Sequence, residues 1–79
     1  EVVVDNFSFA PATIAVKPGG TITWTNKDDV PHIIVSTDGK FKSPVLDTDQ
    51  RYSRGFDAPG TYTYYCAMHP KMTGQIQVG

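Results

Sequence analysis

The stretch "GTYTYYCAMHPKMTGQIQV", residues 60–78, decides the fold of this 79-residue chain and points to its chemistry. It begins with an alternation, in which Tyr62, Tyr64 and Cys66 share one face and the residues between them share the other. The segment "YYCAMHPKM", residues 64–72, then holds the only Cys, one of the two His and both Met of the chain. A period of two is typical of a β-strand with one buried face. The stretch therefore predicts a strand that ends in a cluster of sulfur and imidazole side chains.

The rest of the chain also indicates an all-β protein. Short runs rich in β-branched and aromatic residues alternate with turn-forming Gly, Pro, Asn and Asp, and no window sustains a helical period. Strands are expected near residues 2–9, 13–20, 21–27, 32–37, 51–56, 61–66 and 74–79. The segment 40–50 is the least regular, and we expect it to wrap an edge. About seven strands in one small domain, residues 1–79, predict a β-sandwich or barrel.

Composition excludes several classes of partner. The chain has 7 basic and 8 acidic residues and a net charge of −1, without the basic patch of a protein that binds nucleic acid or a membrane surface. No apolar stretch approaches the roughly 20 residues of a membrane-spanning helix. A single Cys allows no internal disulfide, so a bound metal is a reasonable means of stabilising so small a domain. We expect the chain to be monomeric.

The spacing Cys66-x-x-His69-x-x-Met72 places a thiolate, an imidazole and a thioether directly after a strand. Two His and one Cys with a weak axial Met form the ligand set of a type 1 copper site. The second His has to come from elsewhere, and only His32 remains, at the start of a predicted strand. The sequence therefore predicts one copper ion held by His32, Cys66, His69 and Met72.

The same residues also allow other interpretations. Cys66 alone is more often a small buried hydrophobe, and Met72 could fill the core. Met68 competes for the axial position, but it lies on a short loop between two ligands and is expected to point outward. Asp28 and Asp29 read as a solvated turn. A Cys–His hydrolase would need an orienting third group and a cleft, for which this chain makes a poor case.

Nearly the whole chain resembles the small blue copper proteins, the cupredoxins. The ligand segment, with two residues on each side of His69 and Pro70 after it, is most similar to amicyanin and close to plastocyanin. "FSFAPATIAVKPGGTITWTN", residues 7–26, resembles the opening strands of the family. One departure is Ile33, where the family usually carries Asn. The resemblance implies a Greek-key β-sandwich of about seven to eight strands with one type 1 copper.

The function implied is the transfer of single electrons through Cu(II) and Cu(I), and not catalysis. Redox partner proteins are expected to dock transiently near His69, whose outer edge should reach the surface among Pro31, Met68, Pro70 and Lys71. A copper carrier or store is the alternative. A copper oxidase or reductase would need a second metal site, and both His are already used. By the same resemblance, a periplasmic or other extracytoplasmic location is implied.

Overall fold

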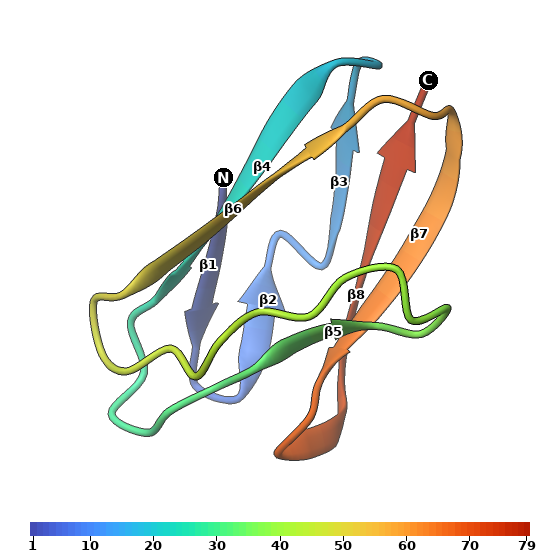
Figure 1. Ribbon diagram of the computed structural model, residues 1–79. Helices are drawn as coiled ribbons and strands as arrows, with labels where there is room; N and C mark the ends of the chain where they lie inside the picture. Colours follow the sequence, from blue (N-terminus) through green and yellow to red (C-terminus); the bar gives the residue numbers. More distant parts are fainter.

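Two four-stranded sheets face each other in the computed structural model, which describes all residues 1–79 (Figure 1). In the first sheet the strand order is β2-β1-β4-β6, and in the second it is β3-β8-β7-β5. The strands are β1 (Val2–Asp5), β2 (Ser8–Ala10), β3 (Thr13–Val16), β4 (Gly20–Asn26), β5 (Ile34–Ser36), β6 (Arg51–Phe56), β7 (Gly60–Cys66) and β8 (His69–Val78). The all-β sandwich expected from the sequence is confirmed.

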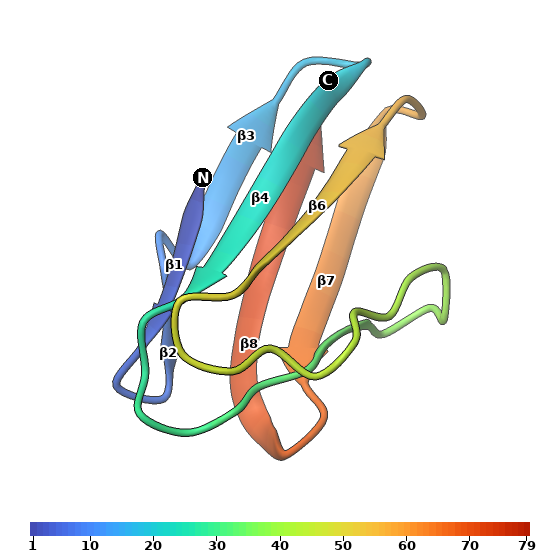
Figure 2. The same ribbon diagram turned by 60° about the vertical axis from the view of Figure 1, so that its left-hand side comes forward.

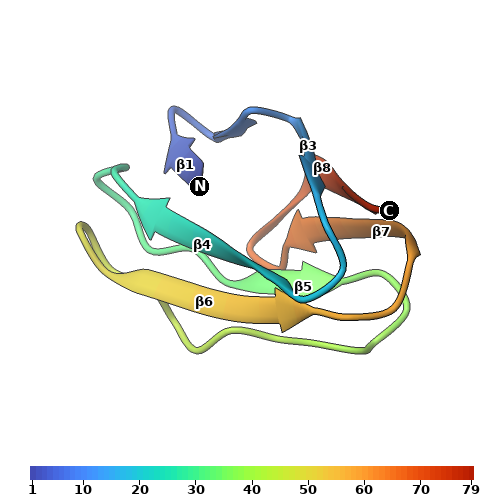
Figure 3. The same ribbon diagram turned by 90° about the horizontal axis from the view of Figure 1, so that it is seen from above.

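Parallel and antiparallel pairs are mixed in this topology. β1 pairs in parallel with β4, and β3 pairs in parallel with β8, whereas the other neighbours are antiparallel. Each parallel pair joins strands that are not consecutive in the chain, as in a Greek-key sandwich. Seen from above, β1, β4 and β6 of the first sheet lie toward the left, and β3, β8 and β7 of the second lie toward the right (Figure 3).

The core lies between these layers and follows the alternation of the sequence. Ile22 and Trp24 of β4 are buried in the same apolar cluster as Tyr64 and Cys66 of β7. Trp24 packs edge-on against Tyr64, with their ring centroids 5.4 Å apart. The full buried apolar cluster is Val2, Val4, Phe9, Ile22, Trp24, Ile34, Phe41, Leu46, Phe56, Tyr64, Cys66, Met72, Ile76 and Val78. Two of the predicted copper ligands, Cys66 and Met72, therefore belong to the core itself.

The irregular segment 40–50 lies along the outer edge of β5, as expected. Isolated bridges join Val35 to Lys42 and His32 to Leu46. These bridges cover the backbone of an edge strand that would otherwise be unpaired.

Four connections meet at one end of the sandwich, here called the ligand pole. They are the β1–β2 turn, the β4–β5 loop, residues 46–50 and the β7–β8 turn, and they lie together at the lower end of both Figure 1 and Figure 2. Hydrogen bonds tie three of them: the Thr48 hydroxyl donates to Asp28 O over 2.6 Å, and Phe7 N–H donates to Asp28 Oδ2 over 3.2 Å. The chain contains no helix long and apolar enough to cross a membrane.

Candidate metal centre

The β7–β8 connection is much tighter than the sequence predicts. The sequence predicts a loop after Cys66 and a last strand from near Gly74, but β8 begins at His69 and only Ala67 and Met68 form the turn. Cys66 pairs directly with His69 in the sheet. The Cys66 and His69 side chains are therefore brought to the same strand end by a two-residue turn.

A break in the pairing register explains why His69 is exposed and Met72 is buried. Tyr65 pairs with Thr73, yet the next residue, Cys66, pairs with His69, so Pro70, Lys71 and Met72 face no partner on β7. Pro has no N–H to donate and favours such an interruption. The irregularity directs Met72 inward, where it is 5% exposed, while Pro70 and Lys71 remain on the surface.

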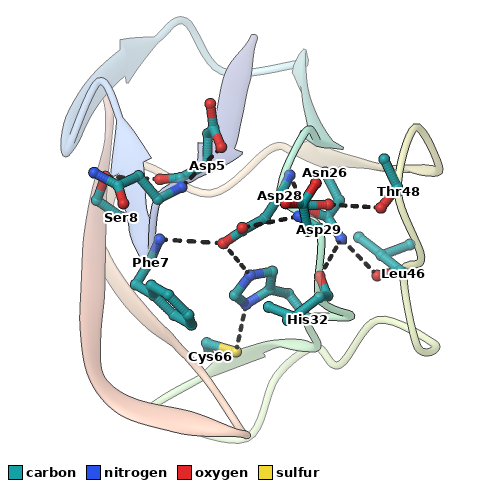
Figure 4. Close-up of polar contacts among 12 residues, drawn as sticks. Asp5, Phe7, Ser8, Asn26, Asp28, Asp29, His32, Leu46, Thr48 and Cys66 are labelled. Atoms are coloured by element: carbon teal, nitrogen blue, oxygen red, sulfur yellow. Dashed lines mark hydrogen bonds and ion pairs between the residues drawn. The ribbon is translucent and has the colours of Figure 1, made fainter.

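His32 meets Cys66 inside the protein. His32 Nδ1 lies 3.2 Å from Cys66 Sγ, and both side chains are fully buried (Figure 4). The two residues are 34 positions apart in the sequence. The predicted convergence of the β4–β5 loop with the end of β7 is thus seen in the structure.

The carboxylate of Asp28 holds the other side of the His32 ring. His32 Nε2 donates to Asp28 Oδ2 over 3.0 Å. A carboxylate only accepts hydrogen bonds, so Nε2 carries the hydrogen, and in the neutral ring Nδ1 then presents a lone pair toward the sulfur. The thiol of Cys66 is then the donor across the 3.2 Å contact. The hydrogen bond from His32 also holds the pKa of Asp28 below its usual range.

His69 completes a group of rings at the ligand pole. Its ring centroid lies 5.7 Å from that of His32 and 4.9 Å from that of Phe7, which meets it edge-on at 87°. His69 is exposed, as the sequence predicts. No three His, Cys, Asp or Glu side chains are close enough together to form a metal-binding group on their own. The structure therefore brings His32 and Cys66 into contact and leaves His69 at the rim.

The donor chemistry fits copper. A buried sulfur faces the unprotonated nitrogen of a buried imidazole, and a second imidazole and a buried thioether lie on the adjoining hairpin. Thiolate and thioether are soft ligands that select Cu(I), and imidazole suits copper in general. The set of residues present is therefore one that a single copper ion could use.

One backbone hydrogen bond and two from a side chain fix the loop that carries His32, although Ile33 lacks the side chain that Asn would supply. Ala67 N–H donates to Ile33 O over 3.0 Å and joins the two ligand-bearing connections directly. Asn26 supplies a second tie, since its Nδ2 donates to Val30 O and to Leu46 O over 3.0 and 2.8 Å. The loop that carries His32 is fixed by these bonds although the usual Asn is absent.

Sequence reasoning missed two residues at this pole. Asp28 was read as solvated, but it is 9% exposed and bonded to His32; Asp29 is exposed as expected. The available signal was a carboxylate four positions before a candidate His ligand, since ligating His usually donates its second N–H to such a group. Phe7 was read only as part of a strand, and no local pattern indicated that its ring would reach His69.

The chain is similar over its whole length to known copper-binding proteins. The family model "Copper binding proteins, plastocyanin/azurin family" matches residues 1–79. Amicyanin-alpha of Methylorubrum extorquens is 36% identical over 83 residues, covering 99% of this chain and 70% of the relative. Amicyanin of Paracoccus denitrificans is 34% identical, covering 98% of this chain and 64% of the relative.

Solved structures of the same fold extend the comparison. A purple cupredoxin from Nitrosopumilus maritimus superposes with a TM-score of 0.92 at 35% identity, covering 99% of this chain and 97% of that one. A copper-containing nitrite reductase from Thermus scotoductus matches with a TM-score of 0.87 at 32% identity, but this chain covers only 22% of it. The chain belongs to the plastocyanin/azurin family of copper-binding proteins, the family of type 1 copper electron-transfer proteins that its sequence resembles.

Proposed function

We propose that residues 1–79 form a single, monomeric domain that holds one copper ion through His32, Cys66, His69 and Met72 and carries single electrons between redox partners. The observation that carries this proposal is the buried 3.2 Å contact between His32 Nδ1 and Cys66 Sγ. It brings two of the type 1 donors together from distant parts of the chain. Copper, when bound, supplies the one-electron couple between Cu(II) and Cu(I).

Each of the four residues has a distinct role in this proposal. Cys66 provides the thiolate, and its burial shields the sulfur from water. His32 provides a buried imidazole with a fixed orientation. Met72 provides a weak axial thioether from the core. His69 is the exposed ligand, so its outer edge is the route by which electrons enter and leave.

Exposed apolar side chains support docking beside His69. Phe7, Val45 and Met68, each about half exposed, are the large hydrophobic residues on the surface. Phe7 contacts the His69 ring, and Met68 is the residue before it. Such a small apolar area suits a brief encounter, because weak electron-transfer interfaces bury little surface. Pro70 and Lys71 are also exposed and extend the same rim.

The alternatives are less well supported. The chain matches the reductase only over a domain-sized share of that enzyme. Both His of the chain belong to the proposed site, which leaves no imidazole for a second metal centre. We therefore propose that this chain is not an enzyme. Its named relatives include amicyanins and plastocyanins. These relatives support electron transfer rather than copper storage, and they also support an extracytoplasmic location.

Absorption spectroscopy with elemental analysis tests the proposed function. The copper-loaded protein should contain one copper per chain and show an intense visible band from Cys-to-Cu(II) charge transfer that disappears reversibly on reduction. Cys66→Ser should abolish this band and keep the fold, because a buried hydroxyl can still donate to His32 Nδ1. We expect its loss of unfolding free energy to stay within about 2 kcal/mol. A colourless wild-type protein that exchanges Cu(I) rapidly would favour the carrier, and a band retained in Cys66→Ser would exclude the thiolate role.

Electron self-exchange tests the docking surface without an identified partner. Met68→Lys places a charge beside His69 and should slow self-exchange at least several-fold, because two copies must bring like charges together. NMR line broadening in mixtures of the two oxidation states measures this rate. Thr61→Lys, at the opposite end of β7, is the matched control and should change the rate little. Equal effects of the two lysines would place the electron route away from His69.

A further inference from the structure

The Asp28 carboxylate accepts hydrogen bonds from three residues of the ligand pole. Oδ2 accepts from His32 Nε2 over 3.0 Å and from Phe7 N–H over 3.2 Å, and Oδ1 accepts from Asp29 N–H over 2.9 Å (Figure 4). The side chain of Asp28 is only 11% exposed. One buried group thus joins the loop that carries His32 to the β1–β2 turn.

The loop itself holds Asp28 in place. Asp28 N–H donates to Asn26 Oδ1 over 2.9 Å, and Asp28 O accepts from the Thr48 hydroxyl over 2.6 Å. Asn26 is in turn anchored to Leu46 O. The backbone of Asp28 is therefore held by hydrogen bonds at both its N–H and its carbonyl oxygen. A residue that orients another side chain requires a fixed position of this kind.

The turn bonded to Asp28 has an unusual backbone. Asn6 and Phe7 have φ angles of 49° and 55°, in the left-handed region. Asn tolerates this region, whereas an aromatic residue there costs about 1–3 kcal/mol. Because of this turn, the half-exposed Phe7 ring lies edge-on to His69 at 4.9 Å and to His32 at 6.2 Å. Strain of this kind persists only where surrounding contacts enforce it, and the bond from Phe7 N–H to Asp28 is such a contact.

We propose that Asp28 is a positioning residue for both imidazoles of the site: it fixes the His32 ring with Nδ1 toward Cys66, and through the Phe7 amide it seats the Phe7 ring against His69. This inference rests on the ligand set proposed above and adds the group that aligns it. His32 lies in the β4–β5 loop and His69 in β8, so a common anchor would keep the relative orientation of the two imidazoles when the charge at the site changes. No step in this role requires Asp28 to touch the metal.

Three variants separate this role from general effects of charge. Asp28→Ala removes every side-chain hydrogen bond. Asp28→Asn keeps the shape, but its amide has one oxygen and cannot accept all three bonds. Asp29→Asn is the matched control, since it removes the same charge from the neighbouring, exposed position.

Two NMR measurements on the full chain without metal, the form in which these bonds are seen, test the geometry directly. Ring ¹⁵N shifts should show the Nε2–H tautomer for His32, and a cross-relaxation peak should connect the Phe7 and His69 rings. Asp28→Ala should mix the tautomers and weaken that peak several-fold, Asp28→Asn should give an intermediate result, and Asp29→Asn should change neither. An Nδ1–H tautomer in the wild-type protein, or an unchanged ring contact in a folded Asp28→Ala variant, would overturn the proposal.

Copper binding provides the second readout. Loss of a partner of a ligating His typically lowers metal affinity about 10–100-fold. We expect a loss of that size in Asp28→Ala, together with a shifted reduction potential, and neither change in Asp29→Asn. Equal losses in the Asp28 and Asp29 variants would overturn the positioning role. Failure of the wild-type protein to form a copper–thiolate band would instead refute the proposed function, while the NMR result would still decide the role of Asp28.

Discussion

At the scale of single residues, the two methionines show how environment separates like side chains. Met72 is 5% exposed and packs in the same apolar cluster as Cys66, whereas Met68 is 50% exposed on the β7–β8 turn. Both lie within three residues of His69 in the sequence. We therefore propose Met72, and not Met68, as the axial donor, because Met72 is buried and the register break at β8 turns it inward.

A pair of substitutions tests this assignment. Met72→Leu should keep the fold, because this swap conserves volume and costs less than about 1.5 kcal/mol. Without the thioether, Cu(II) loses a donor, so the reduction potential should rise. Redox titration measures the change. Met68→Leu is the control and should leave the potential unaltered; a shift in Met68→Leu and none in Met72→Leu would reverse the assignment.

At the scale of elements, the β7–β8 hairpin combines tight packing with an interrupted register. Gly74 lies within β8 and pairs with Tyr64, and is not the first residue of the strand as the expected range 74–79 has it. A Cβ at Gly74 would collide with the ring and hydroxyl of Tyr64, which is fully buried. The absence of a side chain at residue 74 is what lets the Tyr64 ring approach the strand that carries Met72 so closely.

Alanine substitutions at two strand glycines test this packing. Gly74→Ala should lower the free energy of unfolding by about 1–3 kcal/mol, because the buried Tyr64 ring has no room to move. In Gly55→Ala the new Cβ would have as its nearest neighbour Gly20 O at 4.0 Å, so the change should stay within about 0.5 kcal/mol. Denaturant unfolding measures both. Equal stability of the two variants would contradict the close approach at Gly74.

Prediction from sequence succeeded where alternation is local and failed where pairing is distant. Residues 51–56 were predicted as a strand and form β6, because their alternation and flanking turn residues are local signals. Residues 2–9 were read as one run, but Asn6 and Phe7 form a turn that divides them into β1 and β2. Positive φ at Phe7 has no signature in the sequence, since it depends on Asp28, 21 positions away.

The site, too, has parts that could be predicted from the sequence and parts that could not. The spacing of Cys66, His69 and Met72 on one hairpin could be read from the sequence, and His32 followed because no other His exists. The early start of β8 could not be predicted from the sequence, because Pro70 is the second residue of this strand and Pro usually lies outside strands. The burial of Asp28 depends on tertiary contacts that no local pattern encodes.

At the scale of the whole molecule, several carboxylates make stability depend on pH. Hydrogen bonds from the Ser36 hydroxyl and from Lys40 N–H hold the pKa of Asp38 below its usual range. The bond from Lys27 does the same for the pKa of Asp49. A lowered pKa means that the folded state favours the charged form. This stabilisation is present above the unfolded-state pKa of about 3.9 and is lost as the pH falls through the lower folded-state value.

Acid unfolding of the metal-free protein tests this linkage. Between about pH 4.5 and pH 2, the free energy of unfolding should fall less steeply in Asp38→Asn than in the wild-type protein, because one carboxyl that binds a proton more readily when unfolded has been removed. Asp57→Asn, also an exposed site, is the control. The same slope in wild type and Asp38→Asn would mean that Asp38 has equal proton affinity in both states.

The 34-residue separation between His32 and Cys66 has a consequence for the chain as a polymer. An ion bound by both residues would act as a reversible cross-link between the middle of the chain and its C-terminal part. The single Cys of the molecule can form no internal disulfide that would do the same. A permanent link closing a ring of that size would restrict the denatured chain by about 4 kcal/mol. A chelator could then do to this protein what a reducing agent does to a disulfide-bonded one: open the ring and leave a looser, more easily melted chain.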